Sequence, residues 1–166
     1  MRISYYIPLI GSVNINLGKY PSQFYDFLFK KGEINRLQNL EHLGVLHNVF
    51  VGMRHTRWDY TITMLYLIQQ LSESKLEGLS AEKKINKLKL SGRDIMQLLA
   101  LSTNIGHLPG TFTVEKGVMK YLVENPSEAK KLCKKAGLSN ENFDKIDYTN
   151  LNKLLLLVKL DRWISQ

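Results

Sequence analysis

The sequence is poor in the features that mark secreted and membrane proteins. Its one cysteine, Cys133, excludes an intrachain disulfide and suits a reducing compartment. No apolar run reaches the roughly 20 residues that a membrane helix needs. Pro8 and Gly11 interrupt the short apolar stretch near the first residue, and no small-residue cleavage site follows it. We therefore expect a soluble, cytoplasmic protein with no membrane partner.

Acidic residues are scarce relative to basic ones. The chain has 23 Lys and Arg against 15 Asp and Glu, which gives a net charge of +8. This excess favours a polyanionic partner such as a nucleotide or a nucleic acid. Basic residues gather at 83 to 93 and at 130 to 135. We interpret these segments either as solvated helix faces or as phosphate-binding faces.

With 166 residues, 44% of them hydrophobic, the chain is long enough for one domain with one sizeable core. Residues 1 to 20 hold short β-branched pieces separated by Gly11, a pattern that predicts a small β-hairpin or an irregular arm. From Pro21 onward the apolar residues recur at helical spacing. We expect a single all-α domain over 1–166, with the arm at 1–20 and a helical core at 21–166.

Helix signals follow one another along this core. Gly32 separates an early helix from one expected over 34–43, and a longer helix should begin near Thr56 or Arg57. Ser91 with Asp94 resembles a capping box. We expect two helices to bury apolar stripes, made by Ile62, Leu65, Leu67, Ile68 and Leu71 in one and by Ile95, Leu98, Leu99 and Leu101 in the other. Further helices are predicted after Ser80, Thr113, Pro126 and Leu151.

The four histidines are candidate metal ligands, because imidazoles and carboxylates on facing helices hold divalent metals. They are His42, His47, His55 and His107. His107 lies in the turn I-G-H-L-P, and a turn requires the Gly and the Pro but not the His. Composition alone leaves two interpretations open for each histidine, a ligand or a packed and hydrogen-bonded structural residue.

Three stretches have the order of motifs found in one enzyme family. They read I-P-L-I-G-S-V-N-I with I-N-R-L-Q-N-L-E-H-L-G, then V-F-V-G-M-R-H-T-R-W-D-Y, then L-L-A-L-S-T-N-I-G-H-L-P-G-T-F. Together they resemble the HD-domain metal-dependent phosphohydrolases, in particular the deoxynucleotide triphosphohydrolase branch, over roughly residues 5 to 120. The resemblance implies an HD-domain-like helical bundle. Complete enzymes of the family are longer, which implies a fragment or a shortened relative.

The resemblance also implies that most metal ligands have been replaced. The metal-binding His of the second motif falls on Tyr60, and the His-Asp pair of the third falls on Thr103 and Asn104. A final metal-binding Asp would fall on Asp161. A divalent metal (Mn, Fe, Ni or Mg) is expected only if such a site is retained, because neutral oxygen donors bind these ions far more weakly than imidazole and carboxylate do.

Other positions of the motifs are kept. Arg57 matches a phosphate-contacting Arg, His107 matches the His of the I-G-H turn, and His55 matches the His of H-T-R. These three are candidate anion-binding residues, with His107 the catalytic candidate if the protein is active. Alternatively, they are retained because they hydrogen-bond the turn and the helix start.

The main hypothesis is a catalytically impaired HD-domain pseudoenzyme that binds a nucleotide, another polyanion, a protein partner or a second copy of itself. One alternative is a nucleic-acid-binding module that uses the basic segments. Another is an active phosphohydrolase whose metal site is rebuilt from His55, Asp59, His107 and Asp161.

Overall fold

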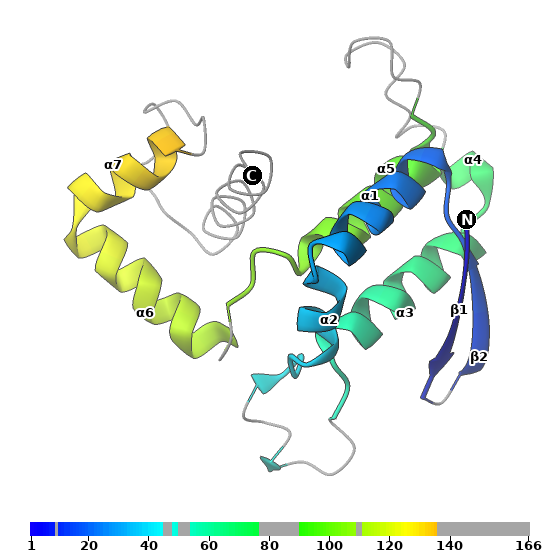
Figure 1. The fold of residues 1–166 in the computed structure, drawn as a ribbon, viewed down its shortest axis with the longest axis horizontal. Helices are drawn as coiled ribbons and strands as arrows, with labels where there is room; N and C mark the ends of the chain where they lie inside the picture. Colours follow the sequence, from blue (N-terminus) through cyan, green and yellow to red (C-terminus); the bar gives the residue numbers. More distant parts are fainter. Residues whose placement is uncertain (9, 45–47, 50–53, 77–89, 109–110, 136–166) are drawn as a thin grey trace. The chain divides into compact units, whose positions relative to one another are not determined.

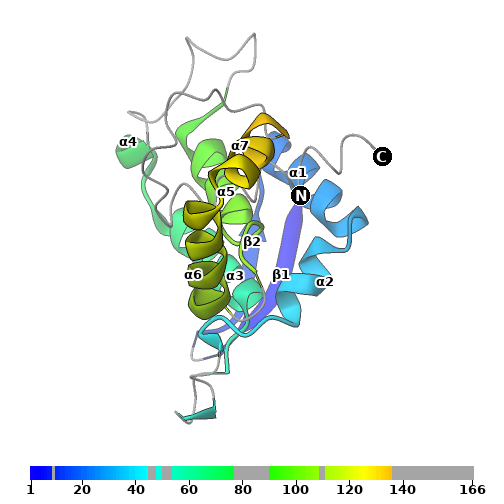
Figure 2. The same cartoon turned by 90° about the vertical axis from the view of Figure 1, so that its left-hand side faces the viewer.

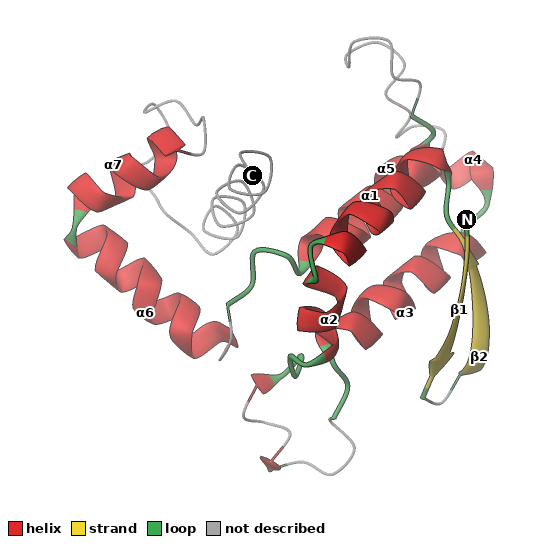
Figure 3. Cartoon of the chain, viewed as in Figure 1, coloured by secondary structure: helices red, strands yellow, loops and turns green. Residues whose placement is uncertain are grey.

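The computed structural model describes residues 1–8, 10–44, 48–49, 54–76, 90–108 and 111–135. The described residues form two strands and seven helices (Figures 1 and 3). They divide into two compact units. The first contains Met1–His42 and Arg54–Asn104, and the second contains the described residues of Leu43–Met53 and Ile105–Gln166. A mostly helical protein that begins with a hairpin agrees with the fold predicted from the sequence.

The hairpin consists of β1 (Arg2–Ile7) and β2 (Gly11–Asn16), paired antiparallel (Figure 2). Ile3 faces Ile15 across the pair and Tyr5 faces Val13. Because side chains alternate between the faces of a strand, these residues share one face, and Ile3, Val13 and Ile15 are buried there. Gly11, the first residue of β2 after the turn, has a φ of 92°, a left-handed conformation that favours glycine.

Five helices complete the first unit: α1 (Lys19–Lys30), α2 (Glu33–Gln38), α3 (Arg57–Gln70), α4 (Glu73–Leu76) and α5 (Gly92–Thr103). Helix α3 contacts both strands, α2 and α5, while α1 contacts α2 and α5. The buried apolar side chains of this unit come from every element: Ile3, Ile7, Val13, Ile15, Leu17, Leu28, Ile34, Leu37, Trp58, Ile62, Leu65, Ile68, Leu76, Ala100 and Leu101.

Capping boxes begin α3 and α5. In each, a hydroxyl accepts from the backbone N–H of an aspartate three residues on, and the aspartate accepts from the backbone N–H of the cap, with Thr56 paired to Asp59 and Ser91 to Asp94. These contacts satisfy two N–H groups that a helix start leaves open. Both predicted helix starts are confirmed.

Two predictions about the helices are wrong. Helix α2 ends at Gln38 instead of near residue 43, because the chain turns there and the carbonyl of Leu40 accepts a hydrogen bond from the N–H of Arg57 at 2.8 Å. Leu67 and Leu99 are 51% and 55% exposed, although the sequence pattern predicts both in buried stripes. Leu67 is adjacent to the buried Ile68, and Leu99 lies two residues before the buried Leu101. Residues one or two positions apart point to different sides of a helix, so Leu67 and Leu99 face away from the core.

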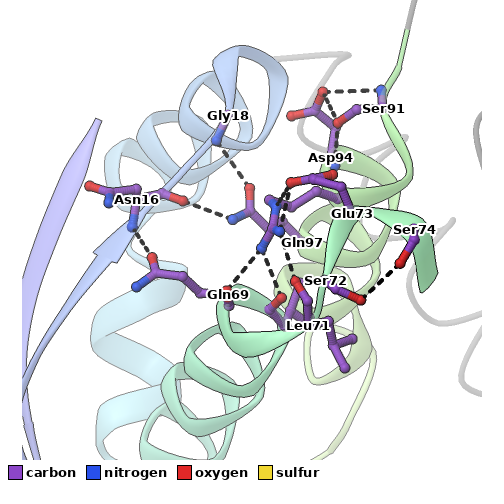
Figure 4. Close-up of polar contacts among 12 residues, drawn as sticks. Asn16, Gly18, Gln69, Leu71, Ser72, Glu73, Ser74, Ser91, Asp94 and Gln97 are labelled. Atoms are coloured by element: carbon purple, nitrogen blue, oxygen red, sulfur yellow. Dashed lines mark hydrogen bonds and ion pairs between the residues drawn. The ribbon is translucent and has the colours of Figure 1, made fainter. Parts of the chain in front are cut away.

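Two glutamines cover the free edge of β2 (Figure 4). Gln69 in α3 accepts from the N–H of Asn16 at 2.7 Å and donates to the carbonyl of Asn14 at 2.9 Å. Gln97 in α5 donates to the carbonyl of Asn16 at 2.8 Å and accepts from the N–H of Gly18 at 3.0 Å. These amides take the place of part of a third strand, because they satisfy the Asn14 carbonyl and both backbone groups of Asn16.

The second unit contains α6 (Thr111–Glu124) and α7 (Pro126–Lys135). Its buried pair, Leu122 and Ala129, packs with Val118, Met119 and Leu132. Helix α6 begins two residues before the predicted start at Thr113. The helices expected after Ser80 and Leu151 lie outside the described residues.

Candidate functional site

The first turn of α3 presents Arg57 and Tyr60, two of the residues singled out by the sequence. The capping box fixes this turn, with Asp59 Oδ2 accepting from the backbone N–H of Thr56 at 2.7 Å and from its hydroxyl at 2.8 Å. The second oxygen of Asp59 accepts from the phenol of Tyr5 at 2.7 Å. The Asp59 carboxylate therefore stabilises the helix start and the hairpin, which argues against a metal site built on it.

Arg57 and Asn104 meet inside the first unit although 47 residues separate them. Arg57 Nη1 donates to Asn104 Oδ1 at 3.1 Å, and Asn104 Nδ2 donates to the hydroxyl of Thr61 at 3.0 Å. That hydroxyl in turn donates to the carbonyl of Arg57 at 2.9 Å. All three residues are buried, with at most 3% of each exposed. We call them the Arg57–Asn104 cluster.

A third helix is joined to the same end of α5. Arg36 in α2 donates from Nη2 to the backbone carbonyl of Asn104 at 3.3 Å. Its Nε donates to Glu33 Oε1 at 2.8 Å, and Glu33 is a buried carboxylate. The last carbonyls of a helix have no partner within the helix. Arg36 satisfies one of them and brings a buried ion pair next to the cluster.

Thr103, the other member of the expected His-Asp pair, lies outside the cluster. It is exposed, and its hydroxyl donates to the carbonyl of Leu99 at 2.7 Å, one turn earlier in α5. Neighbouring residues of a helix are rotated by about 100° from each other. Only Asn104 of this pair therefore points into the buried cluster.

Tyr60 belongs to a stack of three rings. The rings of His42 and Tyr60 lie 4.4 Å apart and are nearly parallel, at 11°. His55 lies 5.1 Å from His42 at an angle of 39°. The backbone holds this arrangement together, since the N–H of His42 donates to the carbonyl of His55 at 3.0 Å. The tyrosine at the expected metal-ligand position is thus packed on His42, which also contacts His55.

His107 lies in the second unit and is paired with an acidic residue that the sequence reasoning missed. His107 Nδ1 is 2.6 Å from Glu115 Oε1, and Glu115 is only 1% exposed. The backbone N–H of Leu108 donates to the same oxygen at 3.3 Å. A carboxylate accepts, so Nδ1 donates and the pair fixes the orientation of the ring. The sequence contains one indication that Glu115 is buried: it lies three residues before Val118 and seven before Leu122, and so on the same face of a helix as these apolar residues.

Several candidate residues lie outside the described part of the chain. They are Asp161, His47 and the lysines Lys83, Lys84, Lys87 and Lys89. Among the residues that the structure describes, no group of three or more His, Cys, Asp or Glu side chains is placed to hold a metal ion. Nor do the described helices include one that is long and apolar enough to cross a membrane.

The described basic residues have two kinds of environment. Arg93 donates to the carbonyls of Ile68 and Leu71, both at 2.9 Å, and to Glu73 at 2.8 Å. Arg93 therefore caps the last turn of α3. In α7, by contrast, Lys130, Lys131 and Lys134 are exposed, and of these Lys131 pairs with Glu128 at 2.7 Å.

Comparison of the chain with protein-family models, with curated proteins and with solved structures gave no match. Any function assigned to the chain therefore rests on its own residues and their contacts.

Proposed function

We propose that the chain is a catalytically inactive relative of the HD-domain phosphohydrolases, and that it acts by binding a partner. The observation that carries this proposal is the hydrogen bond from Arg57 Nη1 to Asn104 Oδ1. It joins the two sequence motifs at the position where the resemblance places a metal-binding carboxylate. The motif geometry is compatible with a common site, while the chemistry of that site has changed.

The electrostatics of the Arg57–Asn104 cluster oppose a metal ion. The amide of Asn104 is neutral, its oxygen accepts from Arg57 and its nitrogen donates to Thr61. A divalent cation bound to Oδ1 would lie beside the buried guanidinium, and repulsion between like charges is strong where water is excluded. Binding would also require the hydrogen bond from Arg57 to break, so the cluster favours a structural role for both residues.

The other replaced ligands support the same conclusion. The Tyr60 ring is stacked on His42, and the Thr103 hydroxyl is bonded within its own helix. A phenol and an aliphatic hydroxyl are both poor ligands when neutral. An altered site built on Asp59 would have to give up the capping box and the hydrogen bond from Tyr5. The contacts of Tyr60, Thr103 and Asp59 therefore favour a structural role for these residues over metal binding.

Metal analysis combined with hydrolysis assays tests this proposal. We expect no stoichiometric Mn, Fe or Ni in the purified protein, and no turnover of deoxynucleoside triphosphates or phosphodiesters when these metals are added. Stoichiometric metal together with turnover would overturn it.

The relation to the family has a separate test. The variant Tyr60→His, Thr103→His, Asn104→Asp restores imidazole and carboxylate donors at the motif positions, and the added change Arg57→Gln removes the guanidinium that would repel a cation. This fourfold variant should gain Mn binding in calorimetry, whereas Thr103→His alone, the matched control, should gain none. A fourfold variant that folds but does not bind Mn would contradict the proposed ancestry.

Nucleic-acid binding is a second candidate, favoured by the exposed lysines of α7. Replacing Lys130, Lys131 and Lys134 by Gln should reduce the salt dependence of binding to a single-stranded oligonucleotide, since fewer counterions are released. Fluorescence anisotropy at two salt concentrations measures this effect. Absence of binding at low salt would exclude this candidate.

A further inference from the structure

The two edges of the hairpin differ. As Figure 4 shows, the edge of β2 is covered by Gln69 and Gln97. The hairpin has only two strands, so β1 has an edge of its own on the opposite side. An uncovered strand edge is a ready template for another strand. The binding capacity of β1 therefore depends on which of its backbone groups point outward and on what lies beside them.

The register of the hairpin identifies the outward groups. Met1 and Leu17 exchange two backbone hydrogen bonds, from Leu17 N–H to the Met1 carbonyl at 2.8 Å and from the Met1 amino group to the Leu17 carbonyl at 3.2 Å. In an antiparallel pair such hydrogen-bonded positions alternate with positions whose N–H and C=O point away. The outward positions of β1 are therefore Arg2, Ser4 and Tyr6.

None of the described residues hydrogen-bonds to these outward backbone groups. The matching outward positions of β2 are Ser12, Asn14 and Asn16. The glutamines bond to the Asn14 carbonyl and to both groups of Asn16, which supports the assignment. Tyr6 is 66% exposed and Ser4 is exposed as well. The edge of β1 thus offers a short ladder of donors and acceptors within the described structure.

A pocket of about 460 Å³ adjoins this edge. Successive residues of a strand point to opposite faces, so a pocket that touches three in a row must reach the edge of the strand. It also touches α1, α2 and α3. We call it the edge pocket; its lining residues are Ile3, Ser4, Tyr5, Tyr25, Phe29, Ile34, Asn35, Gln38 and Trp58.

The edge pocket has the composition of a binding site. Trp58 and Ile34 are buried, whereas Phe29 is 67% exposed. The rings of Tyr25 and Trp58 lie 6.0 Å apart. Aromatic side chains with a few amides are typical of sites that bind apolar groups and orient them by polar contacts, and the volume lies in the range of ligand pockets. Asn35 and Gln38 are exposed and supply these amides.

A second copy of the chain does not fit this site through its own β1. The inward side chains of that strand, Ile3 and Ile7, are already buried in the core of their own unit. Pairing of two β1 strands would therefore leave the edge pocket unfilled. The occupant must be an extended segment that has a large apolar side chain available.

The charges around the edge pocket indicate the sign of the charge that its occupant should carry. Arg2 precedes a lining residue in β1, and Lys30 follows Phe29 in α1; both are exposed. Neither of them makes an ion pair with a described residue. Of the acidic residues near the edge pocket, Asp59 is bonded to Tyr5 and Glu33 to Arg36, and the charge of Asp26 acts on the phenol of Tyr25. With a net charge of +8 for the chain, an acidic segment is attracted and a basic one repelled.

We propose that β1 binds an extended, acidic peptide segment of a partner protein by strand addition, with one large apolar side chain of the peptide in the edge pocket. Main-chain hydrogen bonds to Arg2, Ser4 and Tyr6 supply affinity, and the pocket supplies specificity. This inference deepens the proposed function, because it names the partner of a chain that acts by binding.

Selection from a phage-displayed library of random linear dodecapeptides tests the inference. Enrichment of peptides that combine acidic residues with a large apolar residue is expected, and no enrichment would overturn it. The enriched sequence is then synthesised and its Kd measured with the full chain.

Matched variants test whether the peptide adds to the strand. Ser4→Pro removes an outward N–H and leaves the ladder to β2 intact, so it should weaken binding by about tenfold or more. Ser12→Pro makes the matched change at an outward position of β2, on the opposite edge, and should change Kd by less than about twofold. Equal binding to both variants would overturn strand addition. Phe29→Ala should weaken binding by about tenfold, since the exposed ring would be buried against the apolar side chain of the peptide.

Two measurements on the unmodified chain keep the inference falsifiable even if Ser4→Pro does not fold. Bound peptide should slow hydrogen exchange at the Ser4 and Tyr6 amides, while Ile3 and Tyr5, already paired with β2, change little. Two peptides N-methylated at alternate residues, one at the odd and one at the even positions, should differ in binding. Only one of them keeps the N–H groups that point toward β1, and only that one should bind. Unchanged exchange at Ser4 and Tyr6, or equal binding of both methylated peptides, would overturn the inference.

Failure of this inference and failure of the proposed function are distinguishable. Peptide binding together with metal-dependent hydrolysis would remove only the claim of inactivity. Absence of both hydrolysis and peptide binding would leave an inactive chain with another partner. Protection of the Ser4 amide that increases with protein concentration, without peptide, would instead identify a second copy and overturn the inference.

Discussion

The phenol of Tyr5 donates a hydrogen bond to Asp59 Oδ1 at 2.7 Å and so attaches the first strand to the first turn of α3. The other carboxylate oxygen closes the capping box of that helix with Thr56. One aspartate therefore serves two elements that are 54 residues apart in the sequence. Hydrogen bonds to charged groups contribute more to stability than those between neutral groups.

Tyr5→Phe should lower the free energy of unfolding by about 1–2 kcal/mol, because the ring is kept while the donor to Asp59 is lost. Urea denaturation at pH 7 measures the change. Tyr6→Phe is the control and should be nearly neutral, since Tyr6 is 66% exposed. Equal stability of the two variants would contradict a structural role for this hydrogen bond.

The same pair predicts a loss of stability in alkali. Burial and the Asp59 carboxylate raise the pKa of the Tyr5 phenol above its ordinary value of 10.0. The unfolded chain then loses this proton at lower pH than the folded chain, so the stabilisation is complete below about pH 10 and is lost as the pH rises further. The gap between the original chain and Tyr5→Phe should narrow above pH 10. A gap that widens there would contradict the raised pKa.

The glutamines that cover β2 should contribute unequally to stability. Gln97 is fully buried, and Gln97→Leu would leave the carbonyl of Asn16 and the N–H of Gly18 without these partners. We expect a loss of about 2–4 kcal/mol. Gln69→Leu, nearer the surface, should cost about 1 kcal/mol because water can replace its amide. Chemical denaturation of both variants measures the difference, and equal losses would contradict it.

Much of the fold was predictable because its signals are local. The capping residues Thr56 and Ser91, the break at Gly32 and the stripe of Ile62, Leu65 and Ile68 all operate within a few turns of a helix. The candidate site was predictable only in part. The meeting of Arg57 with Asn104 depends on how α3 and α5 pack, which no local spacing determines.

Polar contacts between distant elements were missed for the same reason. Gln97 bonding to the backbone near β2, and Tyr5 bonding to Asp59, leave no periodic mark in the sequence. The pairing of His107 with Glu115 spans only eight residues, yet a lone glutamate on a helix is usually solvated. The resemblance singled out Asn104 but did not indicate that its amide would bond to Arg57.

The Arg57–Asn104 cluster should contribute strongly to stability. Asn104→Leu would remove the acceptor of a buried guanidinium and the donor to Thr61, at a cost of about 3 kcal/mol. Asn104→Asp keeps an acceptor for Arg57 and should cost less. Thermal and urea unfolding of the two variants measure these losses. An Asn104→Leu variant as stable as the original chain would show that the cluster is dispensable.

Two glycines should respond to alanine in opposite directions. A Cβ at Gly92 would lie 1.9 Å from the backbone carbonyl oxygen of Leu76, so Gly92→Ala should displace α4 from α5 and destabilise the first unit. A Cβ at Gly117, in α6, would meet nothing within 4 Å. Gly117→Ala should therefore stabilise its helix by about 0.5–1 kcal/mol. Melting temperatures measure both changes, and a stabilising Gly92→Ala would contradict the packing of α4.

The glutamine amides along β2 also limit the valency of the hairpin. A two-stranded sheet with both edges open can be extended on either side, and copies of it can then join end to end into fibres. Here the Asn14 to Asn16 part of one edge is occupied by side chains of the same unit. A strand added at this end of β2 would have to displace Gln69 and Gln97, so growth of hairpins edge to edge is disfavoured there, and β1 is the more accessible edge for an added strand.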